Sequence, residues 1–77
     1  MNGLRMFIRP NTGPNNVFYS QRSHGPIYRW HYENHRARWH VARVDASDWS
    51  SHELRVAPWQ SVPEELKAKL SEHYLEY

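Results

Sequence analysis

Residues 26–44, PIYRWHYENHRARWHVARV, carry the pattern that decides the fold. In the first half of this stretch, large aromatic side chains occupy every second position, at Tyr28, Trp30 and Tyr32. Trp39 and Val41 repeat that spacing in the second half. A repeat of two residues is typical of β-strands that bury one face. The stretch therefore predicts a β-hairpin with strands at about 27–33 and 37–44 and with one aromatic face.

The positions between the aromatic residues have the opposite chemistry. They are mainly arginine and histidine, and they comprise Ile27, Arg29, His31 and Glu33 in the first strand and Arg38, His40 and Ala42 in the second. Successive side chains of a strand point to opposite faces of a sheet. The second face of the hairpin is therefore predicted to be cationic and to face solvent or a partner.

Two hairpin loops are compatible with this facing. A two-residue loop at 34–35 pairs Trp30 with Trp39, whereas a four-residue loop at 34–37 pairs Trp30 with Val41. A three-residue loop is excluded because it would turn one strand over and place aromatic residues opposite histidine and arginine. We favour the four-residue loop, because a two-residue type I′ turn needs positive φ at both positions and histidine accepts that conformation poorly.

The length of the chain, 77 residues, predicts one domain with a small core. At this size a single core contributes about 3–5 kcal/mol, and small folds commonly need a further stabilising device. The sequence has no cysteine, which excludes disulfides and thiolate metal sites, but it has four Trp, five Tyr and two Phe. Burial of these rings is the expected compensation. Homodimerisation is a second way to enlarge a small core, so a homodimer is kept as an alternative.

Short apolar runs limit where the protein is expected to reside. The longest are three residues, as in Met6-Phe7-Ile8, which is too short for a membrane span or for the core of a signal peptide. The sequence therefore predicts a soluble, cytoplasmic protein that does not enter a membrane.

Charge is divided unevenly along the chain. Residues 1–43 hold seven arginines and one acid, whereas residues 44–77 hold three basic and seven acidic residues. Arginine suits bidentate contacts with phosphate or carboxylate groups and also stacks on rings. The alternative is a structural role, in which arginine covers aromatic edges and pairs with the acidic C-terminal helix of the same chain.

The rest of the chain supplies further elements. Alternating apolar residues predict strands at about 4–9 and 17–21 and a short one at about 53–57, and residues 10–16, PNTGPNN, have turn composition. Ser61 and Glu64 fit the S-x-x-E capping box, which predicts a helix over about 62–76. Trp49, in the loop at 45–53, is interpreted as a lid on the core or as a recognition residue.

This order of elements predicts an α+β fold. We expect a small antiparallel sheet of three to four strands, arranged as a meander, with one C-terminal helix packed on the aromatic face. No repeat, linker or domain boundary is indicated, so residues 1–77 are expected to form a single domain.

Enzyme chemistry is weakly indicated, and neither a catalytic residue nor a cofactor is proposed. The three glycines, at positions 3, 13 and 25, form no phosphate-binding loop, and His31 and His40 meet no obvious third metal ligand. The turn Ser23-His24 before a basic strand resembles the small ribonuclease toxins of bacterial toxin–antitoxin pairs, but the helix with which those proteins begin is missing here. A small nuclease that uses His24 is therefore the least favoured alternative.

The sequence indicates a non-enzymatic binding module that contacts a macromolecule. A regulator or inhibitor that binds a protein through a Trp- and Arg-rich surface is favoured. The alternative is a nucleic-acid-binding protein that contacts phosphates through the cationic face, with charge that increases as imidazoles gain protons on acidification. The candidate binding residues for either function are Arg29, His31, Arg36, Arg38, His40, Arg43 and Trp49.

Overall fold

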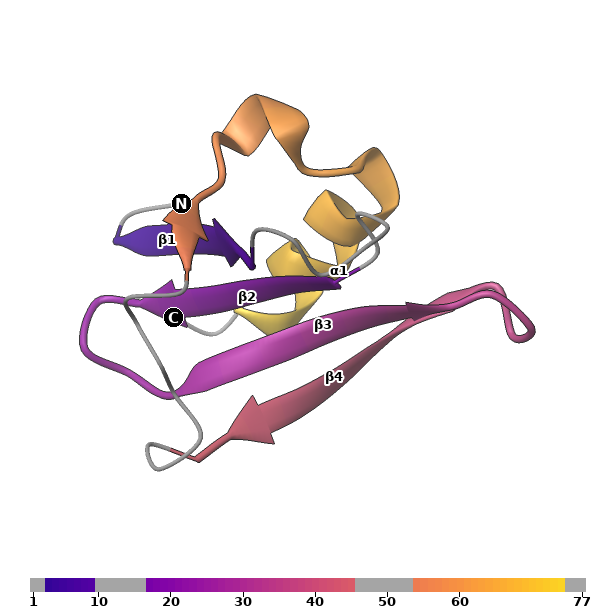
Figure 1. Ribbon diagram of the computed structural model, residues 1–77, viewed down its shortest axis with the longest axis horizontal. Coiled ribbons are helices and arrows are strands. Elements are labelled where there is room, and N and C mark those ends of the chain that lie inside the picture. The colour runs from indigo at the N-terminus through magenta and orange to yellow at the C-terminus, as the bar shows by residue number, and fades with distance from the viewer. Residues whose placement is uncertain (1–2, 10–16, 46–53, 75–77) are drawn as a thin grey trace.

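The computed structural model describes residues 3–9, 17–45 and 54–74 (Figure 1). The described elements, in chain order, are β1 (Leu4–Ile8), β2 (Val17–Arg22), β3 (Ile27–Glu33), β4 (Arg38–Val44), β5 (Arg55–Val56), a 3₁₀ turn (Trp59–Ser61) and α1 (Glu64–His73). The α+β class is confirmed.

The sheet has five strands in the order β4-β3-β2-β1-β5, and every neighbouring pair is antiparallel. β1 to β4 form the predicted meander. The chain then returns to the far edge, where β5 pairs with β1 through Phe7↔Val56 and Ile8↔Arg55. The sheet therefore has five strands where three to four were expected. β5 is also shorter than the predicted strand at 53–57, of which residue 53 lies outside the described residues.

The hairpin has the favoured four-residue loop. Trp30 is paired with Val41 and Tyr32 with Trp39, which confirms the predicted register. The loop ends at Ala37, whose φ of 50° is in the left-handed region. This conformation costs a non-glycine residue free energy, and it turns the chain into β4 without changing the facing of either strand.

Pairing with β3 decides how the N-terminal strands face. Phe18 of β2 is opposite Trp30, and Ser20, two residues further on, is opposite both Tyr28 and Met6 of β1. Phe18 therefore points to the aromatic face. Sequence pattern alone left the facing of β2 open, because residues 17 and 19 are also apolar.

Helix α1 packs on that aromatic face, as predicted, and Figure 1 shows it behind the sheet. Leu66 and Leu70 are fully buried, and Trp30 is 2% exposed. The buried cluster comprises Met6, Phe18, Trp30, Ala57, Val62, Leu66, Leu70 and Tyr74, with Tyr28, Trp39 and Val41 among the partly buried residues around it. Because apolar burial is the main stabilising contribution in a small domain, this cluster fixes which sheet face stays outside.

One polar side chain is buried within this layer. Ser20 is fully buried, and its Oγ accepts a 2.8 Å hydrogen bond from Nε1 of Trp30. The same Oγ lies 2.9 Å from Oη of Tyr74. A hydroxyl can donate one hydrogen bond and accept two, so Ser20 links β3 to the end of the helix without leaving a polar group unpaired.

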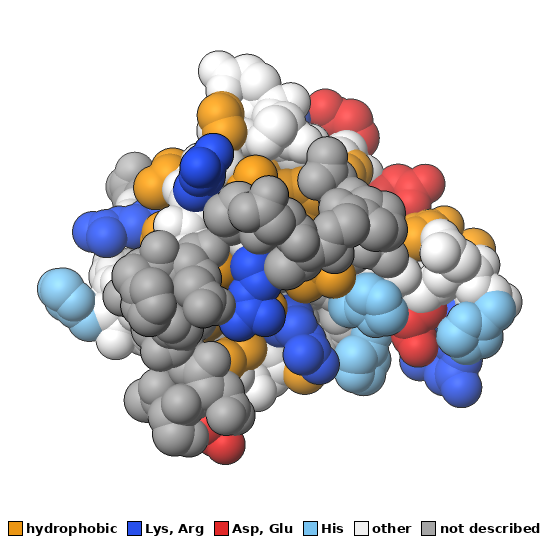
Figure 2. Space-filling view, viewed as in Figure 1, with side chains coloured by type: hydrophobic (Ala, Val, Ile, Leu, Met, Phe, Trp, Pro, Cys, Tyr) orange, Lys and Arg blue, Asp and Glu red, His pale blue; other side chains and the backbone are white. Residues whose placement is uncertain are grey.

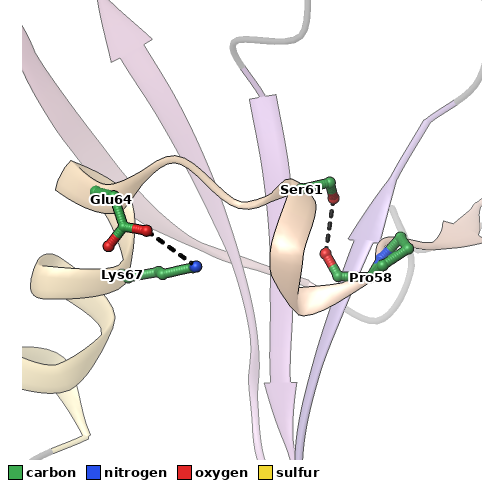
Figure 3. Close-up of polar contacts among 4 residues, drawn as sticks. All are labelled: Pro58, Ser61, Glu64 and Lys67. Atoms are coloured by element: carbon green, nitrogen blue, oxygen red, sulfur yellow. Dashed lines mark hydrogen bonds and ion pairs between the residues drawn. The ribbon is translucent and has the colours of Figure 1, made fainter.

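The predicted capping box is wrong. Helix α1 begins at Glu64 with Pro63 at the N-cap, and no side chain caps it. The hydroxyl of Ser61 donates instead to the carbonyl of Pro58 at 2.7 Å, while Glu64 pairs with Lys67 at 3.2 Å (Figure 3). Ser61 therefore closes the 3₁₀ turn before the helix. At the other end, α1 stops at His73, and residues 75–77 lie outside the described residues.

Candidate functional site

The sheet face opposite α1 carries most of the basic side chains that the strands display. We call it the basic face and define it by Arg5, Arg9, Arg29, His31, Arg38 and His40. Strand alternation and cross-strand pairing place them together: β3 and β4 contribute Arg29, His31, Arg38 and His40, and β1 and the residue after it contribute Arg5 and Arg9. Of the described strand residues on this face, only Glu33 is acidic.

Two rows of residues cross the basic face. In the first, Phe7 is opposite Tyr19, and Tyr19 is opposite Arg29. In the second, Val17 is opposite His31, and His31 is opposite His40. Adjacent strands are about 4.8 Å apart, so the guanidinium and imidazole groups are close neighbours of an aromatic and aliphatic floor.

A shallow pocket of about 330 Å³ opens where these rows meet. Its lining includes Arg9, Val17, Tyr19, Arg29 and His31. Arg9, Arg29 and His31 are exposed, whereas Tyr19 is 9% exposed. The pocket therefore has cationic groups at its rim and a largely buried ring in its floor, an arrangement that suits an anion.

Figure 2 shows the distribution of charge on this side of the molecule. Arginine and histidine side chains gather at the centre and towards the β3–β4 loop, and the acidic side chains in the upper part of the view lie towards α1. Glu64, Glu65 and Glu72 of the helix are exposed. The basic sheet face thus lies opposite a helix of mixed charge, in which three glutamates accompany Lys67 and Lys69.

One cation of the basic face is neutralised locally. Nε of Arg38 donates to Oε1 of Glu33 at 2.9 Å, across the last pair of the hairpin. This hydrogen bond, together with the positive charges of Arg38 and Arg36, lowers the pKa of the Glu33 carboxyl below its usual range. Glu33 is therefore ionised at neutral pH and reduces the charge that Arg38 presents.

Four of the predicted site residues come together and three do not. Arg29, His31, Arg38 and His40 share the basic face, whereas Arg36 is exposed in the loop beside it. Arg43 is opposite Tyr28, so it belongs to the face that α1 covers, where it is exposed near the sheet edge. Trp49 lies outside the described residues, so neither of its predicted roles is tested.

Sequence reasoning missed the contributions of the first two strands. Phe7, Arg5 and Arg9 alternate with Leu4, Met6 and Ile8, a pattern that already separates them from the core residues. What the sequence lacked was the β1–β2 pairing, which brings Phe7 beside Tyr19. The signal was present in the alternation, but its position relative to Arg29 depended on the fold.

A second pocket, of about 390 Å³, lies on the helix side of the sheet, and its lining includes Arg22, Ser23, Tyr28, His73 and Tyr74. The His73 ring contacts Tyr28 edge to face, with ring centroids 4.5 Å apart. His24 is exposed in the neighbouring turn and is not among the described residues that line this pocket. His24, on which the nuclease alternative depended, therefore lies outside the described lining of this pocket.

The described residues form no cluster of three or more metal-ligating side chains, although His31 and His40 are direct cross-strand partners. Within the same part of the chain, no helix has the length and apolar character needed to cross a bilayer. Comparison with known proteins found no matching family, and neither a curated protein nor a solved structure is significantly similar to this chain. Functional inference therefore rests on the geometry of the basic face.

Proposed function

We propose that the protein is a non-enzymatic binding module that contacts single-stranded nucleic acid through the phosphates. The observation that carries this proposal is the gathering of Arg29, His31 and His40, all exposed, on a sheet face where Glu33 is the one acidic residue among the described strand positions. A cationic surface of this kind is the electrostatic signature of phosphate binding.

The burial of the two hairpin tryptophans, Trp30 and Trp39, supports a nucleic acid over the protein partner that the sequence favoured. Protein interfaces depend on a few central aromatic or arginine anchors that become fully desolvated. Here Trp30 is 2% exposed and serves the core, and Trp39 is half-buried on the same side. Phosphate contacts need no apolar anchor, because release of counterions provides the free energy.

The aromatic floor of the basic face favours single-stranded over double-stranded nucleic acid as the ligand. Sheets that bind single strands stack bases on aromatic side chains beside basic residues. Phe7 and Tyr19 are cross-strand partners on the central strands, next to Arg29. Since Tyr19 is 9% exposed, stacking is limited to the accessible part of Phe7, which is half-buried, and phosphate contacts provide most of the affinity. Binding should therefore depend weakly on base sequence.

Titration of labelled oligonucleotides tests this function. Single strands of mixed sequence should bind at low salt and bind more tightly than duplexes of the same length. Arg29→Ala should weaken binding, whereas Lys69→Ala, which removes an exposed cation from α1, should leave it unchanged. The proposal is overturned if no oligonucleotide binds at low salt, or if the two variants lose affinity equally.

A protein partner is the second candidate, supported by exposed apolar side chains at and after β5. Among the described residues, the exposed large apolar side chains are Val56, at 71%, and Trp59, at 41%. Val56 lies in β5 opposite Phe7, and Trp59 begins the 3₁₀ turn that follows. Trp is a common interface anchor. A partner captured from the native host that survives nuclease and is lost with Trp59→Ala would establish this function in place of nucleic-acid binding.

A further inference from the structure

We infer that the 330 Å³ pocket on the basic face is a site for a terminal phosphate group, a phosphomonoester at the end of a nucleotide chain. The inference rests on the proposed function and deepens it, since it names the part of the ligand that the pocket takes. It also assigns roles to Arg9 and Tyr19, which the sequence did not select.

The pocket draws its groups from separate strands. Arg9 follows β1, Val17 and Tyr19 come from β2, and Arg29 and His31 come from β3. Cross-strand pairing fixes Tyr19 beside Arg29 and Val17 beside His31. Val17, Tyr19, Arg29 and His31 are held by two paired strands, so the sheet ladder sets their spacing, and Arg9 is attached directly to the end of the neighbouring strand β1. Such a site is largely formed before the ligand arrives.

Its charge fits a phosphomonoester better than a phosphodiester. A phosphomonoester carries about −1.5 to −2 charges at neutral pH, whereas each phosphodiester of a chain carries one. Two guanidinium groups, from Arg9 and Arg29, line the pocket together with the imidazole of His31, and none of the described lining residues is acidic. Guanidinium groups also match the geometry of phosphate oxygens through paired hydrogen bonds.

Positive charge on the basic face is greater at this pocket than at the loop end of the hairpin. Arg38 is paired with Glu33 at 2.9 Å, so its positive charge is offset at the loop end of the hairpin. Along β3, Glu33 is four residues from Arg29, about 13 Å, and two residues from His31, about 7 Å, so within the pocket lining Arg29 is the more distant of the two from the acid. The attraction for a doubly charged group is therefore strongest at Arg29.

The pocket volume indicates what accompanies the phosphate. About 330 Å³ is at the lower end of the range for small-molecule sites and exceeds the space that a phosphate group fills. Val17 and Tyr19 provide an apolar wall for the attached sugar or base. A terminal nucleotide thus fits the site, with the phosphate at the arginines and the nucleoside against the wall.

The test compares one single-stranded oligonucleotide in three forms: 5′-phosphorylated, 3′-phosphorylated and unphosphorylated. One phosphorylated form should bind roughly tenfold more tightly than the unphosphorylated form, the factor expected for one added contact between charged groups. Arg29→Ala should abolish this advantage. Arg38→Ala leaves the negative charge of Glu33 unopposed, so it should weaken all three forms by a common factor, and it should preserve the advantage because Arg38 is outside the pocket. Circular dichroism of each variant establishes that it is folded.

The outcomes separate this inference from the proposed function. Equal affinity for all three forms overturns the terminal-phosphate site and leaves nucleic-acid binding intact. An advantage that persists in Arg29→Ala overturns the placement of the site. No binding of any form at low salt overturns both. Titration with inorganic phosphate, followed by NMR shifts of the backbone amides of Val17, Tyr19 and Arg29, should locate the anion at the pocket, and shifts elsewhere would contradict the assignment.

Discussion

Arg38 and Glu33 close the β3–β4 hairpin with a hydrogen bond of 2.9 Å between Nε and Oε1. The contact joins the half-exposed side chain of Arg38 to the partly exposed side chain of Glu33 at the end of the basic face. An exposed ion pair of this kind contributes little to stability. Its larger effect is electrostatic, because Glu33 is the one acid among the described strand residues that opposes the cations of this face.

Removal of that acid should strengthen nucleic-acid binding. Glu33→Gln keeps the size of the side chain and abolishes its charge, so Arg38 becomes available to a phosphate. We expect tighter binding of single strands at low salt and a salt dependence that is steeper by about 0.7, the value for one more phosphate contact. Glu64→Gln, which changes an exposed acid on α1, is the matched control and should change neither quantity. Unchanged binding by Glu33→Gln would show that Arg38 does not contact the ligand.

The lowered pKa of Glu33 predicts a pH dependence of stability. A carboxyl whose pKa is lower in the folded state stabilises the fold at pH values above its unfolded pKa, and this contribution disappears as pH falls through the folded pKa. Urea unfolding should therefore show stability that declines below about pH 4.5. In Glu33→Gln this decline should be smaller than in the wild-type protein. An identical acid limb in the two proteins would mean that Arg38 does not stabilise the ionised carboxylate.

The buried hydroxyl of Ser20 should matter more than its size suggests. Ser20→Ala leaves Nε1 of Trp30 without its acceptor and removes the contact with Oη of Tyr74. A buried donor without a partner costs about 1–3 kcal/mol. The double variant Ser20→Ala/Trp30→Phe removes donor and acceptor together, so it should cost less than the sum of the single changes. Additive losses in urea unfolding would show that the two groups are not coupled.

Replacing the loop residue Ala37 with glycine should stabilise the protein. Its φ of 50° is unfavourable for any residue with a Cβ, by about 1–2 kcal/mol. Ala37→Gly is thus expected to raise the free energy of unfolding. The gain is reduced in part because glycine increases the conformational entropy of the unfolded chain. Ala68→Gly, at an exposed helical position, should lower it by about 0.5–1 kcal/mol. If the two substitutions destabilise equally, the four-residue loop is wrong.

The sequence predicted the hairpin well because its pattern is unambiguous. Trp30 and Trp39 belong to runs with a strict two-residue repeat, and the choice of loop followed from the cost of positive φ. The facing of β2 was not predictable in the same way, since apolar residues occupy 17, 18 and 19 in succession. It depends on the pairing of Phe18 with Trp30, which is a long-range contact that no local pattern contains.

The helix start and the basic face also depend on contacts that local sequence patterns do not contain. Ser61 and Glu64 match a capping box in sequence, but the Ser61 hydroxyl bonds to Pro58 and leaves the helix to begin at Glu64. Only some residues of the candidate site were predicted from the sequence. Local alternation identified Arg29 and His31, whereas Arg9, directly after β1, joins them only in the pocket of the folded chain, and Arg43 lies on the other face.

The central claim, that the basic face binds single strands through their phosphates, is tested most directly by the salt dependence of affinity for the wild-type protein and Arg29→Ala. With three or four phosphate contacts, log–log plots of affinity against salt should have a slope of roughly −2 to −3 for the wild-type protein, and Arg29→Ala should lower its magnitude by about 0.7. A slope near zero, or an identical slope in the two proteins, would contradict the claim.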